Sequence, residues 1–305
     1  MKYLFFLIFF LNIVFYSFLV SKPLNLETDF SIKEGSNLSE IFSDLEEKKI
    51  PFPKAIKLLF NVSGIDKKIY LGKYNIYEGD SLYDIFNKIY LGKITLKKFI
   101  VPEGSKLNDL FSDEIINKYC RNFVSHGDCD LEGYIKPDIY LYDRESELFT
   151  ILKTSIKKQN IILNKSWNER KDKLESFSKK TILTIASILE KESCANEREK
   201  ISGVIYNRLQ KNMFLQMDST TIYGLKDFNG NLKKKDLRDS SLYNTYMHKG
   251  LPPGPISNPS RSSIIAAGQP EEHDFLYFVA KDKCSHEFST NYKDHLKAVK
   301  KYQIK

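Results

Sequence analysis

The sequence predicts an α+β protein in three parts: an N-terminal transmembrane helix, a small α/β subdomain, and a larger mixed α+β domain. Three observations predict this organisation: an apolar run at the N-terminus, a strand–turn–helix pattern used three times in the first half, and helical apolar periodicity in the second half. With 305 residues, 42% of them hydrophobic and 28% charged, the chain can bury one large core or two medium ones.

The first part is the run over residues 3–20, which is mostly apolar and approaches the length that spans a bilayer core. A cleaved signal peptide is the alternative, but the run exceeds the usual apolar core of such signals, and no small-x-small pair precedes a plausible cut. We therefore expect a retained transmembrane anchor over residues 1–21. Because Lys2 lies on the short N-terminal side, the positive-inside tendency places the rest of the chain outside the cytoplasm.

The second part carries a degenerate repeat, IKEGSNLSEIF at 32–42, IYEGDSLYDIF at 76–86 and VPEGSKLNDLF at 101–111. Each copy predicts a short strand, a Glu-Gly turn, a Ser or Asp able to cap a helix, and then a helix. The uneven spacing of the copies favours a compact domain over a regular solenoid. We place the domain boundaries at 22–100 for the small subdomain and 101–305 for the larger one.

The larger domain contains an apolar helix at 181–193, TILTIASILEKES, whose apolar residues recur every three or four positions. Glu190 and Glu192 lie near its end. Glu192 would lie over the apolar Ile185, Ile188 and Leu189, surroundings that favour a neutral carboxyl. A neutral carboxyl can act as a general acid near neutral pH, which the cleavage of a glycosidic bond requires. The alternative is a helix end whose carboxylates simply face water.

A stiff loop follows, because GLPPGP at 250–255 can be neither helix nor central strand. Neutral hydrogen-bonding side chains flank it, and they suit a neutral polyol better than a phosphate, which would favour Gly-rich turns with Lys or Arg. The alternative is that these side chains merely pin the loop. The candidate sugar contacts are Tyr243, Asn244, Thr245, Tyr246 and Asn258.

Composition excludes several classes of function. The net charge of +8 is spread in short groups without an Arg-rich helix or a zinc pattern, so we expect no nucleic-acid binding. The five histidines show no ligand spacing, and we expect no metal and no cofactor. Of the four cysteines, Cys120 and Cys129 are near enough in sequence to pair, whereas we expect Cys194 to be a packed thiol.

Six motifs, in this order, resemble the MltG (YceG-like) endolytic murein transglycosylases: ASILEKES at 186–193, VIYNRL at 204–209, LQMDSTTIYG at 215–224, YNTY at 243–246, GLPPGPISNP at 250–259 and LYFVA at 276–280. The repeat also resembles the opening of a LysM module. The resemblance implies one membrane helix, a LysM-like subdomain and a catalytic domain in the periplasm or outside the cell. It also implies cleavage within nascent peptidoglycan strands to leave 1,6-anhydromuramyl ends, and association with peptidoglycan synthases at the cytoplasmic membrane.

The resemblance places the catalytic glutamate at Glu192, because the Glu192-Ser193 pair resembles that of lytic transglycosylases. Such an enzyme uses the C6 hydroxyl of its substrate in place of water, so one carboxyl suffices. Ser219 stands where family members usually have proline. Two alternatives stay open: a muramidase that uses water, with Asp218 as a second carboxylate, and a non-catalytic peptidoglycan-binding scaffold. The other candidate substrate-binding or supporting residues are Glu190, Gln216, Asp218, Thr220 and Tyr223.

Overall fold

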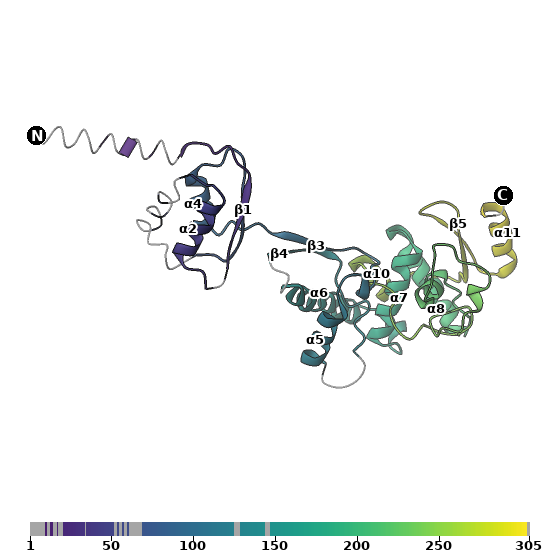
Figure 1. Ribbon diagram of the computed structural model, residues 1–305. Helices are drawn as coiled ribbons and strands as arrows, with labels where there is room; N and C mark the ends of the chain where they lie inside the picture. The colour runs from purple at the N-terminus through teal and green to yellow at the C-terminus, as the bar shows by residue number, and fades with distance from the viewer. Residues whose placement is uncertain are drawn as a thin grey trace, which may run out of the picture. The chain divides into compact units, whose positions relative to one another are not determined.

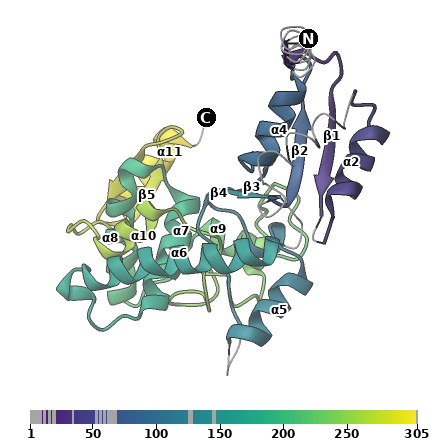
Figure 2. The same cartoon turned by 90° about the vertical axis from the view of Figure 1, so that its left-hand side faces the viewer.

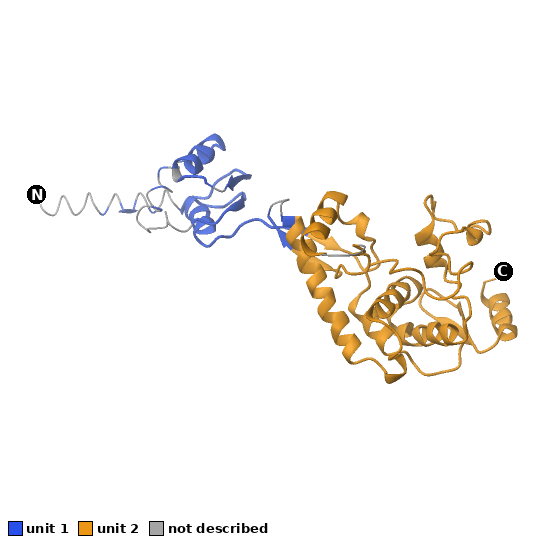
Figure 3. Ribbon diagram, turned by 90° about the horizontal axis from the view of Figure 1, so that it is seen from below, with its two compact units in different colours: residues 1–98, 141–147 blue, residues 99–140, 148–305 orange. Residues whose placement is uncertain are grey.

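The computed structural model describes residues 10, 13, 14, 17, 21–33, 35–51, 54, 57, 60, 69–124, 129–143 and 147–303. The chain divides into two compact units, unit 1 with residues 1–98 and 141–147, and unit 2 with residues 99–140 and 148–305 (Figure 3). Most of the apolar run at 3–20 lies outside the described residues. Within the described part, no helix combines the length and apolar character needed to cross a bilayer, so the transmembrane helix stays a prediction.

Unit 1 is built from two copies of the repeat. Strand β1 (Thr28–Ile32) pairs antiparallel with β2 (Gly72–Ile76), and helices α2 (Leu38–Glu47) and α4 (Leu82–Tyr90) follow them. Asn37 caps α2, and Ser81 caps α4 in a reciprocal capping box with Asp84. The core contains the stacked rings of Phe30 and Tyr74, both almost fully buried. These two copies confirm the predicted strand–turn–helix pattern.

The third copy departs from the prediction. Strand β3 (Lys97–Val101) is followed by a single 3₁₀ turn, η2 (Leu107–Asp109), and the next α-helix, α5 (Asp113–Phe123), begins only after Ser112. The residue that precedes the turn is Lys106, whose side chain makes no capping hydrogen bond, whereas Asn37 and Ser81 cap the helices of the other copies. The N–H of Leu107, the first residue of this turn, instead donates to the Glu132 carboxylate.

Unit 2 consists mainly of helices, with short strand pairs (Figures 1 and 2). Strand β3 pairs with β4 (Asp138–Tyr142), and β5 (Tyr277–Ala280) forms an antiparallel hairpin with β6 (His286–Ser289). The mixed α+β class of the prediction is confirmed. The remaining helices and 3₁₀ turns are α6 (Leu148–Asn168), η4 (Asp172–Leu174), α7 (Lys179–Glu192), η5 (Ala195–Glu197), α8 (Arg198–Gln210), α9 (Asp218–Gly224), η6 (Asp236–Arg238), α10 (Arg261–Gly268) and α11 (Tyr292–Tyr302).

Helix α7 is the centre of unit 2. Ser178 and Thr181 form a capping box at its start, and Ser193 ends it. All residues from Ile182 to Leu189 are buried, because α6, α8 and α10 pack around the helix (Figures 1 and 2). The buried stretch is mostly apolar, and its hydroxyl Ser187 donates to the Thr184 carbonyl within the helix, so the helix suits a core. The sequence-based prediction of a buried helix with Glu190 and Glu192 near its end is therefore confirmed.

Two disulfides cross-link unit 2. Cys120 pairs with Cys129, and Cys194 pairs with Cys284 across 90 residues of sequence, so that the four cysteines leave no free thiol. The prediction that Cys194 is a packed thiol is wrong. The hairpin β5–β6, whose turn carries Cys284, returns to the residues just after α7, and sequence spacing alone does not reveal that approach.

Candidate active site

Glu192, the last residue of α7, lies in the wall between two cavities of unit 2. We call the larger one, of about 570 Å³, the aromatic cavity, and the smaller one, of about 280 Å³, the lysine cavity. Asp218 also lines both. The other residues of the aromatic cavity include Gln216, Tyr246, Tyr277, Phe278, His286, Tyr292 and His295. The other residues of the lysine cavity are Lys106, Lys191, Ser219, Ile222, Tyr223 and Ile256.

The Glu192 carboxyl has surroundings that favour its protonated form. Burial raises its pKa, and the nearby charge of Asp218 raises it as well. Two bonds from Ser219 act in the opposite direction, because the hydroxyl donates to Oε1 over 2.5 Å and the backbone N–H donates to the same oxygen over 3.3 Å. Burial outweighs them, so the pKa of Glu192 stays raised and the group can act as a general acid.

Two segments meet beside Glu192. The Gln216 N–H donates to the Thr245 carbonyl over 3.1 Å, and Gln216 adopts a left-handed φ of 51°, a strained conformation that often occurs at functional sites. Asp218 begins α9 and accepts a hydrogen bond of 2.6 Å from the Tyr246 hydroxyl. The structure thus brings Glu192, Gln216, Asp218 and Tyr246 together, as the candidate site requires.

Four other candidates form the framework behind the cavities. Thr220 and Thr245 are buried and share a hydrogen bond of 2.8 Å, and Thr245 also accepts from the Met217 N–H. Asn244 is fully buried, and its amide donates to the carbonyls of Leu237 and Asp239. Asn258 is fully buried too. Its side chain accepts from the Ile135 N–H over 3.0 Å and donates to the Ser105 carbonyl over 3.1 Å, so it pins a turn and lines neither cavity.

The two tyrosines Tyr223 and Tyr243 lie against each other, with ring centroids 4.7 Å apart. The Tyr223 ring lines the lysine cavity, and its hydroxyl donates to Glu132 over 3.1 Å. Glu132 is a buried carboxyl that also accepts from the Leu107 N–H over 3.2 Å. Burial raises the pKa of Glu132, while these two hydrogen bonds lower it.

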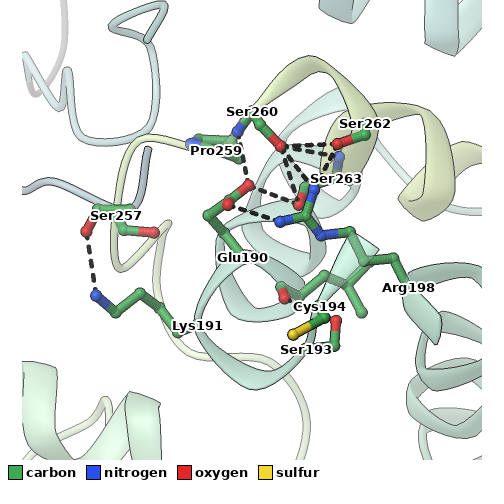
Figure 4. A network of polar contacts seen from close by, with 12 residues as sticks. Glu190, Lys191, Ser193, Cys194, Arg198, Ser257, Pro259, Ser260, Ser262 and Ser263 are labelled. Atoms are coloured by element: carbon green, nitrogen blue, oxygen red, sulfur yellow. Dashed lines mark hydrogen bonds and ion pairs between the residues drawn. The ribbon is translucent and has the colours of Figure 1, made fainter. Parts of the chain in front are cut away.

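Glu190 takes part in a buried network rather than in a cavity (Figure 4). Its carboxylate forms an ion pair of 2.8 Å with Arg198 and accepts from the Ser260 N–H and the Ser263 hydroxyl. These serines lie at the N-terminus of α10, where a negative charge is favoured by the helix dipole. Glu190 therefore joins the end of α7 to α8 and α10, in a supporting position behind Glu192.

Several residues of the site have no counterpart in the sequence-based candidates. Ser219 belongs to the LQMDSTTIYG motif and Tyr277 to the LYFVA motif, but neither residue had a predicted role. His286 reaches the aromatic cavity while its Nδ1 lies 2.7 Å from Glu197 Oε2. Lys106 and His286 are distant from Glu192 in sequence, so only information on which segments lie together in the fold could have identified them. Within the described residues, no group of three or more histidines, cysteines or carboxylates could hold a metal ion.

Comparisons with known proteins find relatives of this chain over most of its length. The family model described as the YceG-like family matches residues 30–301. An endolytic murein transglycosylase of Bacillus subtilis (strain 168) is 31% identical over 318 residues, which cover 93% of this chain and 87% of that protein. An endolytic murein transglycosylase of Streptococcus pneumoniae serotype 2 is 26% identical over 295 residues, 82% of this chain and 53% of that protein. The crystal structure of a yceG-like protein from Listeria monocytogenes has a TM-score of 0.57 and 29% identity, covering 90% of this chain and 99% of its own.

Proposed function

Because the chain belongs to the YceG-like family, we propose that it is an endolytic murein transglycosylase whose catalytic residue is Glu192. The substrate is a peptidoglycan strand, cleaved between N-acetylmuramic acid and N-acetylglucosamine. The observation that carries the assignment of Glu192 is its place: a carboxyl of raised pKa that lines two adjoining cavities. A strand that fills both cavities would place sugars on either side of the carboxyl, as cleavage inside a strand requires.

The reaction needs one proton donor that later becomes a base. Glu192 gives its proton to the glycosidic oxygen as the bond from C1 of the muramyl sugar breaks. The resulting carboxylate then takes the proton of the C6 hydroxyl, whose oxygen bonds to C1 and closes the anhydro ring. No water is consumed, and Glu192 ends protonated, ready for the next turnover. The N-acetyl group of the substrate or nearby dipoles stabilise the oxocarbenium-like state between these steps.

A second candidate function rests on Asp218, which lines both cavities together with Glu192. A carboxylate beside the general acid could activate water or attack C1, as in glycoside hydrolases, and the enzyme would then be a muramidase. The hydrogen bond from Tyr246 holds the Asp218 carboxylate in one orientation, which serves either to orient the sugar or to direct water.

The rest of the chain supports this activity in three ways. Residues 1–21 anchor the protein in the cytoplasmic membrane as a single-pass helix, with the body in the periplasm or outside the cell. Residues 22–100 form a LysM-like subdomain that contacts glycan, and residues 101–305 form the catalytic domain. A position at the membrane also allows association with peptidoglycan synthases.

Alkaline carbonate extraction tests the anchor, because an integral protein stays in the membrane pellet and a variant lacking residues 1–21 does not.

Mass spectrometry of the products tests the activity. Uncross-linked strands are incubated with the full chain in detergent, with Glu192→Gln and with Glu175→Gln, a matched control whose exposed side chain lines neither cavity. We expect anhydromuramyl ends from the wild type and from Glu175→Gln, and none from Glu192→Gln. Glu190→Gln is a poor control, because it removes the partner of the buried Arg198.

Two results would contradict the proposal. Products one water heavier, lost in Asp218→Asn, would establish a muramidase that uses Asp218. Intact strands that nonetheless bind equally well to the wild type and to Glu192→Gln would establish a non-catalytic scaffold.

A further inference from the structure

The lysine cavity carries two ammonium groups next to the catalytic carboxyl. Lys106 lies half-buried, with its Nζ 5.1 Å from the centroid of the Tyr223 ring, and Lys191 is exposed, with its Nζ 3.2 Å from the Gly104 carbonyl. Neither forms an ion pair with a carboxylate in the described part of the chain. Other lysines of unit 2, such as Lys136 with Asp138, do form such pairs. The two positive charges of this cavity are therefore left uncompensated by a direct partner.

The position of Lys106 is fixed by buried groups on both sides. The following residue, Leu107, donates its N–H to Glu132, and the same carboxyl accepts the hydroxyl of Tyr223. The preceding residue, Ser105, is held through its carbonyl by both the backbone N–H and the side-chain amide of Asn258. Glu132 thus ties together the two elements that carry Lys106 and Tyr223. A cation placed over a ring by buried hydrogen bonds is a prepared position rather than a freely moving surface lysine.

Lys191 reaches the cavity because it immediately precedes Glu192 at the end of α7. The turn at Gly104 has a left-handed φ of 71°, and a Cβ added there would lie 3.3 Å from the Lys191 side chain. This close approach keeps the Lys191 stem against the turn that leads to Lys106. Two segments 85 residues apart in sequence therefore each contribute a lysine side chain to the lining of one cavity.

The charges of the two cavities differ. The lysine cavity has two ammonium groups against the Asp218 carboxylate, whose Oδ1 is engaged by Tyr246, a residue of the aromatic cavity. The aromatic cavity has one arginine, Arg208, whose guanidinium already donates to the Leu215 and Leu276 carbonyls. It otherwise presents Tyr246, Tyr277 and Tyr292, rings of the kind that stack on sugars. A neutral sugar would leave the two ammonium groups of the lysine cavity with the Asp218 carboxylate as their one full counter-charge, whereas an anionic ligand would supply a second.

We propose that the lysine cavity binds a carboxylate of the peptide attached to the muramic acid of the strand, with Lys106 and Lys191 as its ligands. This inference rests on the proposed function, since it takes a peptidoglycan strand as the substrate. The enzyme accordingly discriminates peptide-bearing strands with free carboxylates from strands in which these charges are absent. The contacts add binding energy at one side of Glu192 and take no part in bond cleavage.

The test uses one strand preparation in two forms: peptides with free carboxylates, and the same peptides after conversion of the carboxyl groups to methylamides. The full chain in detergent is compared with Lys106→Met and Lys191→Met, and with Lys211→Met, an exposed lysine that lines neither cavity. We expect the wild type and Lys211→Met to show a KM about three- to tenfold lower for the free-carboxylate strand. Each cavity variant should raise KM for that strand and leave the methylamide strand unaffected.

Equal KM values for the two strands with the wild type would overturn the inference, as would a loss in the lysine variants that is the same for both strands. If the wild type cleaves neither strand, the proposed function fails, and equilibrium binding decides the inference by itself. Tighter binding of the free-carboxylate strand that is lost in Lys106→Met would support it, and equal binding of both strands would refute it.

Discussion

Replacing Glu190 by Gln tests whether the two carboxylates at the end of α7 have different roles, Glu190 in stability and Glu192 in catalysis. The Glu190 side chain is 5% exposed and that of its partner Arg198 8% exposed. The change keeps the shape of the side chain but removes its charge, so that the guanidinium loses its only carboxylate partner in the described structure. Arg198 already has one buried nitrogen, Nε, without a hydrogen-bond partner. The variant therefore adds an uncompensated charge to a site with little spare hydrogen-bonding capacity.

The expected cost follows from the burial of this pair. Removing one partner of a buried ion pair typically lowers the free energy of unfolding by about 3–5 kcal/mol. For a domain of the size of unit 2, each kcal/mol corresponds to about 2–4 °C in Tm, so we expect a fall of about 10 °C. Below that transition the variant should still cleave glycan strands, because Glu190 lines neither cavity.

Thermal and denaturant unfolding of the full chain in detergent measure the change. Glu199→Gln is the matched control, since its exposed carboxylate lies one residue after Arg198. The double variant Glu190→Gln/Arg198→Met leaves no buried charge and should recover part of the loss. A fall of less than about 1 kcal/mol in Glu190→Gln would refute the reasoning, as would a double variant whose loss equals the sum of the two single losses.

Two further predictions concern the site and its frame. In Ser219→Ala, the loss of a hydrogen bond that lowers the pKa of Glu192 should raise that pKa further in the free enzyme. The basic limb of the pH profile of kcat/KM should then move to higher pH, and an unmoved limb would show that the hydroxyl does not act on the acid. Removing the Cys194–Cys284 disulfide, which closes 90 residues, should lower the free energy of unfolding by about 4.6 kcal/mol, against about 2.6 kcal/mol for Cys120–Cys129, which closes 9. Denaturant titration of the two double-alanine variants measures the difference, and an equal or reversed order would contradict this loop-closure argument.

Much of the local structure could be predicted from the sequence. The apolar periodicity of α7 and the Ser81 cap of α4 depend only on residues a few positions apart, and these elements form as predicted. Helix α2 also forms, but its cap is Asn37 and not the predicted Ser or Asp. The third repeat copy differs, since a 3₁₀ turn follows Lys106 where a helix was predicted. Burial raises the pKa of Glu192, which is the direction inferred from its helix.

The neutral side chains around the proline loop were less predictable. Tyr246 lines the aromatic cavity, whereas Asn244, Thr245 and Asn258 are buried and bind backbone groups. A short polar side chain has the same hydrogen-bonding groups in either role. Whether it meets a ligand or a carbonyl depends on which segment of the chain covers it, and that is set by packing between distant elements.

The sequence by itself determined the α+β class, the buried helix that ends at Glu192, and the family resemblance, because these follow from spacing and order along the chain. Only the tertiary structure decided that Glu190 binds Arg198 while Glu192 lines the cavities. It also decided that Cys194 pairs with Cys284 and that Lys106 and Lys191 line the same cavity. Each of these contacts joins different elements or loops. Such contacts depend on how side chains of different elements pack and satisfy each other's charges and hydrogen bonds. Local sequence spacing does not determine that packing.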